Sequence, residues 1–240
     1  IHHEAVHEID GWDDLRRRLQ PDRRCFAFFH PQLSEEPLIF VEVALLPDIP
    51  ASIAPLVDKK SVPVEPHQFK SAIFYSISNC QPGLKGVSMG NFLIKRVAES
   101  LKKEFPTLKT FCTLSPIPGF IEWLSSGVGL TSVDLKPGIV EKYQQAFNVL
   151  DLKKISWHER VQAGWHPDTC STKEREALEC LCAIYLMHYS PKRGGNSVAK
   201  FHLGNGAKLQ RINWAGDLSK KGIKQSAGLM VNYLYDLEKV

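Results

Sequence analysis

The order of apolar patterns along the chain predicts an α+β fold in which strands come before and after a group of helices. Continuous apolar runs of strand length, helical spacing in the middle and a return to strand patterns near the end support this order. The strand patterns cover residues 25–29, 38–46, 72–78, 207–214 and 229–234. Because there are no repeats, low-complexity tracts or clear linkers, we expect one domain over residues 1–240.

The first part of the chain is expected to pair strands around surface loops. Residues 12–19 are predicted to form a short helix with a basic face at residues 16–18, three consecutive arginines. The segment 31–37 is typical of the loop of a hairpin between the first two strands. Residues 58–70 are polar and contain two prolines, which indicates a surface loop.

The middle of the chain contains the clearest helical pattern. A helix over residues 90–104 places five apolar residues on one face and is stopped by Pro106. These five are Leu93, Ile94, Val97, Ala98 and Leu101. A strand that ends at Ser115 follows. Further helices are predicted over residues 118–126, 138–150 and 173–188.

Composition favours a globular protein with a small anionic ligand. Of the 240 residues, 43% are hydrophobic and 23% are charged, which allows a sizeable core. The net charge of +4 is mild and its basic residues are dispersed, so we expect no nucleic-acid partner, whereas a nucleotide-bearing small molecule suits this balance. No apolar run reaches the roughly 20 residues of a membrane span, so we expect no membrane partner.

The six cysteines indicate reduced thiols in an intracellular protein. No pair has the C-x-x-C spacing of a zinc or redox site. Cys25, Cys80 and Cys112 lie in or beside apolar runs, where a cysteine behaves as a small buried hydrophobe. Because the sequence begins with Ile1, we expect it to be a fragment whose targeting signal is not visible.

A glycine loop between a strand and a helix is a candidate phosphate site. Gln81-Pro82-Gly83-Leu84-Lys85-Gly86-Val87 lets backbone N–H groups face a ligand, and the following helix adds partial positive charge. Lys85, Lys95 and Arg96 add positive charge. The loop fits neither G-x-x-x-x-G-K-[ST] nor G-x-G-x-x-G, so an ordinary glycine turn before a helix stays open.

Two other stretches offer catalytic chemistry. Ser115 precedes Pro116-Ile117-Pro118-Gly119, whose prolines stiffen the backbone and hold the hydroxyl still. His202 precedes Gly204-Asn205-Gly206, so we expect its imidazole at the mouth of a turn and not in the middle of a helix. A stiff exit from a strand and a structural histidine are the ordinary alternatives, and Ser115 lacks the G-x-S-x-G context of hydrolases.

The segment His3-Glu4-Ala5-Val6-His7 fits the H-E-x-x-H pattern of zinc peptidases. Asp10-Gly11 follows at once, so the segment can scarcely form the long helix that holds two histidines on one face. We therefore prefer a polar entry segment and expect no metal.

Several longer motifs, in order along nearly the whole chain, resemble the malonyl-CoA decarboxylase family. They lie at residues 74–78, 81–87, 92–97, 114–120, 198–203, 211–214 and 228–233. The resemblance implies an acetyltransferase-like (GNAT) fold with a mixed sheet flanked by helices. In the family a helical bundle precedes this domain and supports oligomerisation, so the full-length protein is expected to be a homo-oligomer.

The resemblance also implies the site residues. It assigns catalytic roles to Ser115, His202 and Tyr235. It assigns binding of the CoA pyrophosphate to the glycine loop, which comprises Gln81, Gly83, Leu84, Lys85, Gly86, Val87, Ser88, Met89 and Gly90. Ser88 departs from the family, some members of which have an acidic residue there, and a serine supplies no carboxylate.

The activity that the resemblance implies is the conversion of malonyl-CoA to acetyl-CoA and CO2. The thioester is the electron sink, so no metal or organic cofactor is expected. His202 would protonate the enolate, Ser115 would orient the carboxylate or His202, and Tyr235 would support the site. A GNAT acyltransferase and a non-catalytic acyl-CoA-binding module are the alternatives. The expected location is the mitochondrial matrix, with the peroxisome or cytosol as alternatives.

Overall fold

The computed structural model describes residues 6–7, 9, 11–84, 90–126, 135–152, 154–190 and 195–237, which form two compact units. The first unit comprises Ile1–Ser115, Asn205–Leu209 and Asn232–Val240. The second unit comprises Pro116–Gly204 and Gln210–Val231. Three strands run from one unit into the other, namely β5 (Ser115–Pro116), β6 (Lys208–Asn213) and β7 (Met230–Tyr235). That the two units act as one domain stays a prediction.

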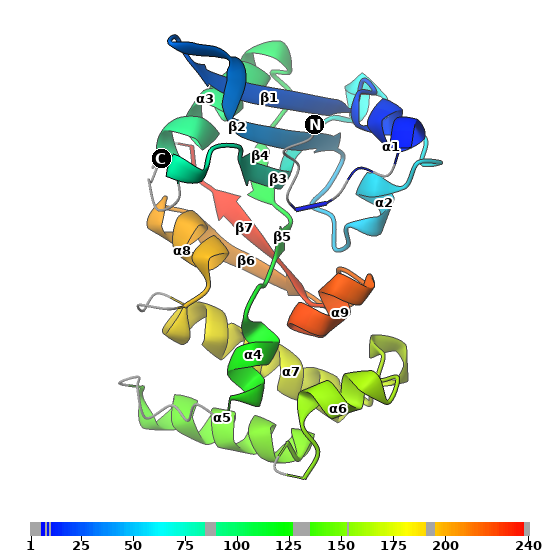
Figure 1. The fold of residues 1–240 in the computed structure, drawn as a ribbon, viewed down its shortest axis with the longest axis vertical. Helices are drawn as coiled ribbons and strands as arrows, with labels where there is room; N and C mark the ends of the chain where they lie inside the picture. The colour runs from blue at the N-terminus through cyan, green and yellow to red at the C-terminus, as the bar shows by residue number, and fades with distance from the viewer. Residues whose placement is uncertain are drawn as a thin grey trace. The chain divides into compact units, whose positions relative to one another are not determined.

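The first unit is built on a sheet of mixed direction (Figure 1). Its strands are β1 (Arg23–His30), β2 (Leu33–Leu46), β3 (Ser71–Asn79), β4 (Thr110–Thr113) and the end of β7. They lie in the order β1-β2-β3-β4-β7, and only β3 and β4 run parallel among these neighbours. A parallel pair requires a crossover, which here contains helix α3 (Gly90–Glu104). This confirms the α+β class with a mixed sheet and helices.

Helix α3 confirms the prediction made from its apolar spacing. All five residues expected on its inner face are buried, with Ile94, Ala98 and Leu101 fully so. The helix also begins and ends as predicted, because a glycine opens it and Phe105-Pro106 follows it. The unit has two shorter helices, α1 (Gly11–Arg18) and α2 (Ala54–Val57), and 3-10 turns at Pro66–Gln68 and Pro82–Leu84.

The prediction of a basic surface on α1 is wrong. Arg17 and Arg18 are buried, and each forms ion pairs inside the first unit. Arg18 contacts Glu42 of strand β2 at 2.9 Å, while Arg17 contacts Asp22 at 2.7 Å. These partners neutralise charges that would otherwise stay in water.

Two local expectations about β1 and β2 are also wrong. The hairpin loop is shorter than residues 31–37, because β2 begins at Leu33 and that residue pairs with His30. Cys25 is exposed, since the burial pattern along β1 alternates where a buried run was expected. Cys80 and Cys112 are buried, as predicted.

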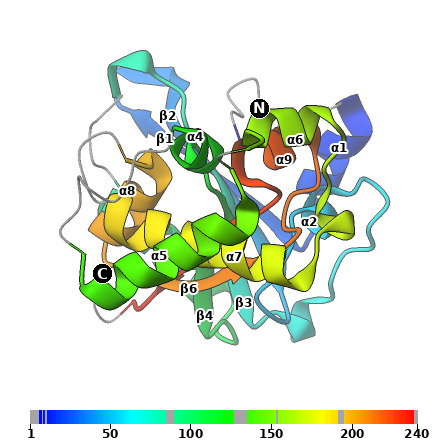
Figure 2. The ribbon, with the colours of Figure 1, turned by 90° about the horizontal axis from the view of Figure 1, so that it is seen from below.

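The second unit consists mainly of helices. They are α4 (Phe120–Ser125), α5 (Pro137–Leu150), α6 (Trp157–Gln162), α7 (Thr172–Ile184), α8 (Ser197–Gly204) and α9 (Lys220–Ser226). A π-helical turn, Tyr185–Tyr189, continues α7, and a 3-10 turn covers Pro167–Thr169. Helices α5 and α7 pack along each other (Figure 2). In the described part of the chain, no helix combines the length and the apolarity that crossing a membrane requires.

Helices α6, α8 and α9 were not predicted, although two of them carry a recognisable start. Ser156 and Glu159 form a capping box on α6, in which the Ser156 backbone N–H donates to Glu159 Oε2 at 2.8 Å. Ser219 caps α9 by accepting from the Gly222 N–H at 3.0 Å. The predicted helices at 118–126, 138–150 and 173–188 correspond to α4, α5 and α7 with its π turn.

Candidate active site

Ser115 is buried at the end of the first unit, where β4 gives way to β5. Its Oγ donates a hydrogen bond of 2.9 Å to Thr113 Oγ1. The same Thr113 oxygen accepts from the Tyr233 backbone N–H at 3.1 Å, and the Thr113 carbonyl accepts from Asn232 Nδ2 at 2.8 Å. The serine hydroxyl is therefore held by a network that joins β4 to β7.

Tyr235 lies in the same part of the first unit. It is the last residue of β7 and pairs with Phe111 of β4, two residues before Thr113. Its ring is 4% exposed, and this burial raises the pKa of the phenol above its usual range. The hydroxyl is therefore protonated at neutral pH and is able to act as a hydrogen-bond donor.

The glycine loop is described only in part. Lys85, Gly86, Val87, Ser88 and Met89 lie outside the described residues. Gln81 follows β3, and its Nε2 donates to Glu36 Oε2 at 3.1 Å and to the Pro37 carbonyl at 3.3 Å. Gly83 and Leu84 belong to the 3-10 turn Pro82–Leu84, and Gly90 opens helix α3. The segment does connect a central strand to the N-terminus of a 15-residue helix, as a phosphate site requires.

His202 belongs to the second unit and lies in the last turn of α8, directly before a turn at residues 205–206. Its expected place at the mouth of a turn and not in mid-helix is confirmed, although the helix itself was not predicted. The side chain is 4% exposed, and burial lowers the pKa of the imidazole to about 3. The ring is therefore neutral at pH 7, with one nitrogen as donor and the other as acceptor. The imidazole packs edge to face with the Phe201 ring, at a centroid distance of 5.0 Å.

The turn after Ser115 is held by hydrogen bonds from two residues that the sequence analysis did not identify as site residues. The Pro118 carbonyl accepts from the Tyr185 hydroxyl at 2.9 Å and from Asn196 Nδ2 at 3.0 Å. Gly119 has φ +78°, and a Cβ there would lie 2.8 Å from the Tyr185 hydroxyl. A π turn such as the one that carries Tyr185 is often found at functional sites, but sequence periodicity does not reveal it.

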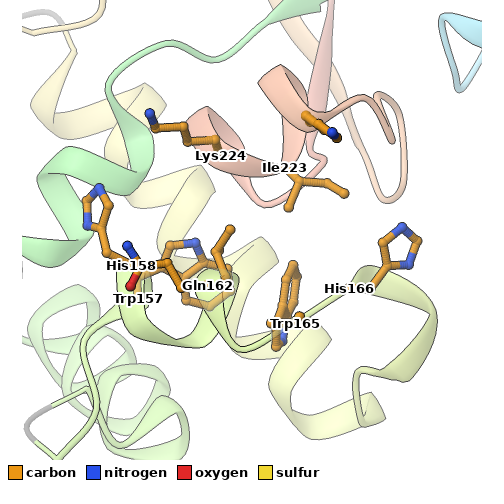
Figure 3. Close-up of a pocket in the computed structure, with 10 residues that line it drawn as sticks. Trp157, His158, Gln162, Trp165, His166, Ile223 and Lys224 are labelled. Carbon is orange, nitrogen blue, oxygen red and sulfur yellow. The ribbon is translucent and has the colours of Figure 1, made fainter.

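Several hollows open on the described part of the second unit, and besides the two below there is a smaller one of about 160 Å³ beside Gly119 and Lys221. The larger of the two main hollows, about 560 Å³, lies between the α6 region and α9 (Figure 3). The other, about 480 Å³, is lined by the Pro118–Gly119 turn, Trp123, Tyr185, Tyr189 and Asn196. Ser115, His202 and Tyr235 are not among the described residues that line either one.

The zinc pattern near the start cannot be followed, because His3 and Glu4 lie outside the described residues. Among the residues that are described, no three histidine, cysteine, aspartate or glutamate side chains gather as a metal site would require. The absence of a metal from the reaction stays a prediction.

Comparison with known proteins supplies the family. The model of the malonyl-CoA decarboxylase C-terminal domain matches residues 1–240. The mitochondrial malonyl-CoA decarboxylases of Anser anser anser and Mus musculus are 44% and 43% identical over 98% of this chain. This chain covers 48% and 50% of those two proteins, so it spans about half their length.

Solved structures agree with the sequence relatives. Malonyl-CoA decarboxylase from Cupriavidus metallidurans is 43% identical, with a TM-score of 0.75 over 98% of this chain and 57% of its own. The enzyme from Rhodopseudomonas palustris is 43% identical, with a TM-score of 0.76 over 100% of this chain and 56% of its own. With a family model that matches every residue, the chain belongs to the malonyl-CoA decarboxylase C-terminal domain family.

Proposed function

We propose that this chain is the catalytic part of a malonyl-CoA decarboxylase, which converts malonyl-CoA to acetyl-CoA and CO2. The observation that carries the proposal is the family match over all 240 residues, together with relatives of that name at 42–44% identity. Because those relatives are about twice as long, the activity is proposed for the full-length protein.

The chemistry needs a site that stabilises an enolate. When the carbon–carbon bond breaks, CO2 leaves and the electron pair delocalises onto the thioester oxygen. Hydrogen-bond donors in a buried site stabilise such an oxyanion well, because no water competes for their protons. Tyr235 is a buried hydroxyl of this kind, whereas the buried Ser115 hydroxyl donates its single proton to Thr113 Oγ1 and would have to turn toward the substrate to donate there. We propose that Ser115 orients the substrate carboxylate or His202, with Tyr235 as a supporting donor.

His202 is proposed to return a proton to the enolate carbon. With a pKa of about 3 the imidazole is uncharged before substrate binds. A carboxylate brought next to a buried imidazole raises its pKa, because the opposite charge favours the protonated form. Malonyl-CoA would thus charge the ring that later gives up the proton, and the loss of CO2 removes the carboxylate that held it there.

No metal or organic cofactor is proposed, since the thioester accepts the electrons.

The loop from Gln81 to Gly90 is proposed to bind the CoA pyrophosphate at the start of α3. The names of the relatives support a mitochondrial location, with peroxisome and cytosol as alternatives. A homo-oligomer is proposed for the full-length protein.

The test is incubation of the full-length protein with malonyl-CoA, followed by mass spectrometry. Acetyl-CoA formed without added amine or metal supports decarboxylation. An acylated amine would favour a GNAT acyltransferase, and unchanged malonyl-CoA with tight binding would favour a binding module. His202→Ala is expected to abolish turnover while CoA binding persists, and full activity in that variant would refute the role of His202.

A further inference from the structure

We propose that Asn196 is a positioning residue for this reaction. It ties the first turn of α8, the helix that carries His202, to the turn that follows Ser115. This inference rests on the proposed decarboxylation. It concerns a residue that neither the sequence motifs nor the catalytic assignments include.

The Asn196 side chain bonds in two directions at once. Its Oδ1 accepts from the Ala199 backbone N–H at 3.0 Å, which caps the start of α8. Its Nδ2 donates to the Pro118 carbonyl at 3.0 Å. The residue is 3% exposed, so water does not compete with either bond. One amide therefore joins the helix start to the turn.

The turn needs such a side chain because it has few donors of its own. Pro116 and Pro118 have no backbone N–H, so the Pro116–Gly119 segment depends on its carbonyls and on its neighbours for anchoring. The Pro118 carbonyl receives a second hydrogen bond, at 2.9 Å, from the Tyr185 hydroxyl. Both lone pairs of this carbonyl are thus occupied by side chains.

An aspartate at position 196 separates the two bonds. Its carboxylate still accepts from the Ala199 N–H and caps the helix, but it has no proton to give to Pro118. Asn196→Asp therefore keeps the helix start and breaks the link to the turn. Asn196→Ala loses both bonds, and Tyr185→Phe removes only the second donor to Pro118.

The experiment compares kcat and KM for malonyl-CoA in the full-length protein and these variants. Since a displacement of about 1 Å in an active site costs on the order of 100-fold, we expect Asn196→Asp to lower kcat by about 10- to 100-fold. We expect KM within about threefold, with the kinetics measured well below an unfolding midpoint that the buried carboxylate at position 196 lowers. Ser219→Asp is the matched control, because it places the same carboxylate at the cap of α9, and it should keep the wild-type kcat.

Each outcome is decisive. A wild-type kcat in Asn196→Asp, or a loss confined to KM, would overturn the positioning role. A loss of kcat in Ser219→Asp equal to that in Asn196→Asp would also overturn it, since the effect would then be one of charge. Failure of the wild-type protein to form acetyl-CoA would instead contradict the proposed function, and with it this role.

A separate observation concerns the larger hollow, and here we infer a binding site for a small aromatic anion. Its volume of about 560 Å³ lies in the range of small-molecule sites. Val161, Trp165 and Ile223 supply apolar and aromatic wall, and Figure 3 shows Ile223 and Lys224 on the side opposite Trp157 and Trp165. Such walls suit a flat ring.

The rim of the hollow selects for negative charge. Lys220 and Lys224 line it from α9, and His158 and His166 from the α6 region. The described lining residues include no carboxylate, although Asp168 contacts His166 at 3.2 Å from outside the lining. A ring that bears a carboxylate or a phosphate would place its apolar body in the hollow and its charge near the lysines.

Isothermal titration calorimetry tests this site with 2-naphthoate, its neutral analogue 2-naphthamide, and AMP. We expect 2-naphthoate to bind about tenfold more tightly than the amide, and Lys224→Glu to weaken it by a similar factor. Lys173→Glu, an exposed lysine of α7 away from the hollow, should change nothing. If AMP binds and Lys224→Glu weakens that binding, the natural ligand of the hollow is a nucleotide. If 2-naphthoate binds and AMP does not, the natural ligand is an aromatic acid. No binding of 2-naphthoate, or equal binding by Lys224→Glu, overturns the inference.

Discussion

Arg18 gives the sharpest test of how the first unit is held together. Its Nε contacts Asp14 Oδ1 at 2.8 Å and its Nη1 contacts Glu42 Oε2 at 2.9 Å. Arg18 is 2% exposed and Glu42 is 1% exposed. Replacing Arg18 with methionine keeps much of the apolar volume but leaves two carboxylates buried without their cation. Breaking a buried ion pair in this way destabilises a protein by about 3–5 kcal/mol.

Urea denaturation followed by tryptophan fluorescence measures this loss for Arg18→Met. The matched control is Arg16→Met on the same helix, where Arg16 and Asp13 are mostly exposed and 3.7 Å apart. An exposed pair contributes at most about 1 kcal/mol, so the control should hardly change the free energy of unfolding.

A triple variant, Arg18→Met with Asp14→Leu and Glu42→Leu, distinguishes two causes of the expected loss of stability. One is the loss of the ion pairs themselves, and the other is the cost of burying carboxylates without a cation. It removes the charges of Arg18, Asp14 and Glu42 together, and we expect it to be more stable than Arg18→Met alone. A loss below about 1 kcal/mol in Arg18→Met would refute the reasoning, since the carboxylates would then tolerate burial alone. A triple variant less stable than the single one would do the same.

Three further predictions concern single positions. Gly119→Ala should lower stability by about 1–3 kcal/mol in thermal denaturation, because of φ +78° and the close Tyr185 hydroxyl, whereas Gly138→Ala in α5, which meets nothing within 4 Å, should not. Burial alone would raise the pKa of Asp22, but hydrogen bonds from Arg17 and the Val64 N–H overcome this and hold it below its usual range. Stability from this group is therefore complete above its unfolded pKa of about 3.9 and is lost as the pH falls toward its folded pKa, and Asp22→Asn should flatten that part of the stability curve. Trp157→Ala should cost about 3–5 kcal/mol in urea denaturation, because the indole is fully buried, and a loss under 1 kcal/mol would contradict this.

Local patterns predicted the elements whose stability is local. Helix α3 was found because its apolar residues recur at helical spacing, and β3 because its run is apolar on both faces. The burial of Arg18 could not be found in this way, because its partner Glu42 is 24 residues away. Charge runs are normally solvated, and only the pairing of α1 with β2 reverses that expectation.

In the candidate site, too, the short-range features could be predicted from the sequence and the long-range contacts could not. Ser115 and its partner Thr113 are two residues apart, and the stiff turn after them is visible in the prolines. The bond from the Tyr233 N–H spans 120 residues, and the link from Asn196 to Pro118 spans 78. Helix α8, which carries His202, was not predicted. The turn signal Gly204-Asn205-Gly206 was the strongest local pattern there, and the eight-residue helix that Asn196 caps ends at this signal.

The π turn at Tyr185–Tyr189 changes the direction in which the residues after it face around the helix axis. Its wide ladder is closed by the Ser190 N–H, which donates to the Tyr185 carbonyl at 2.8 Å across five residues. Each residue of an α-helix advances the chain by about 100° around the axis, so the extra residue turns everything beyond it relative to α7. Deleting one residue from this turn would restore the α ladder and rotate Ser190 about the axis relative to α7. The number of residues in this turn therefore sets the direction in which Ser190 leaves the helix.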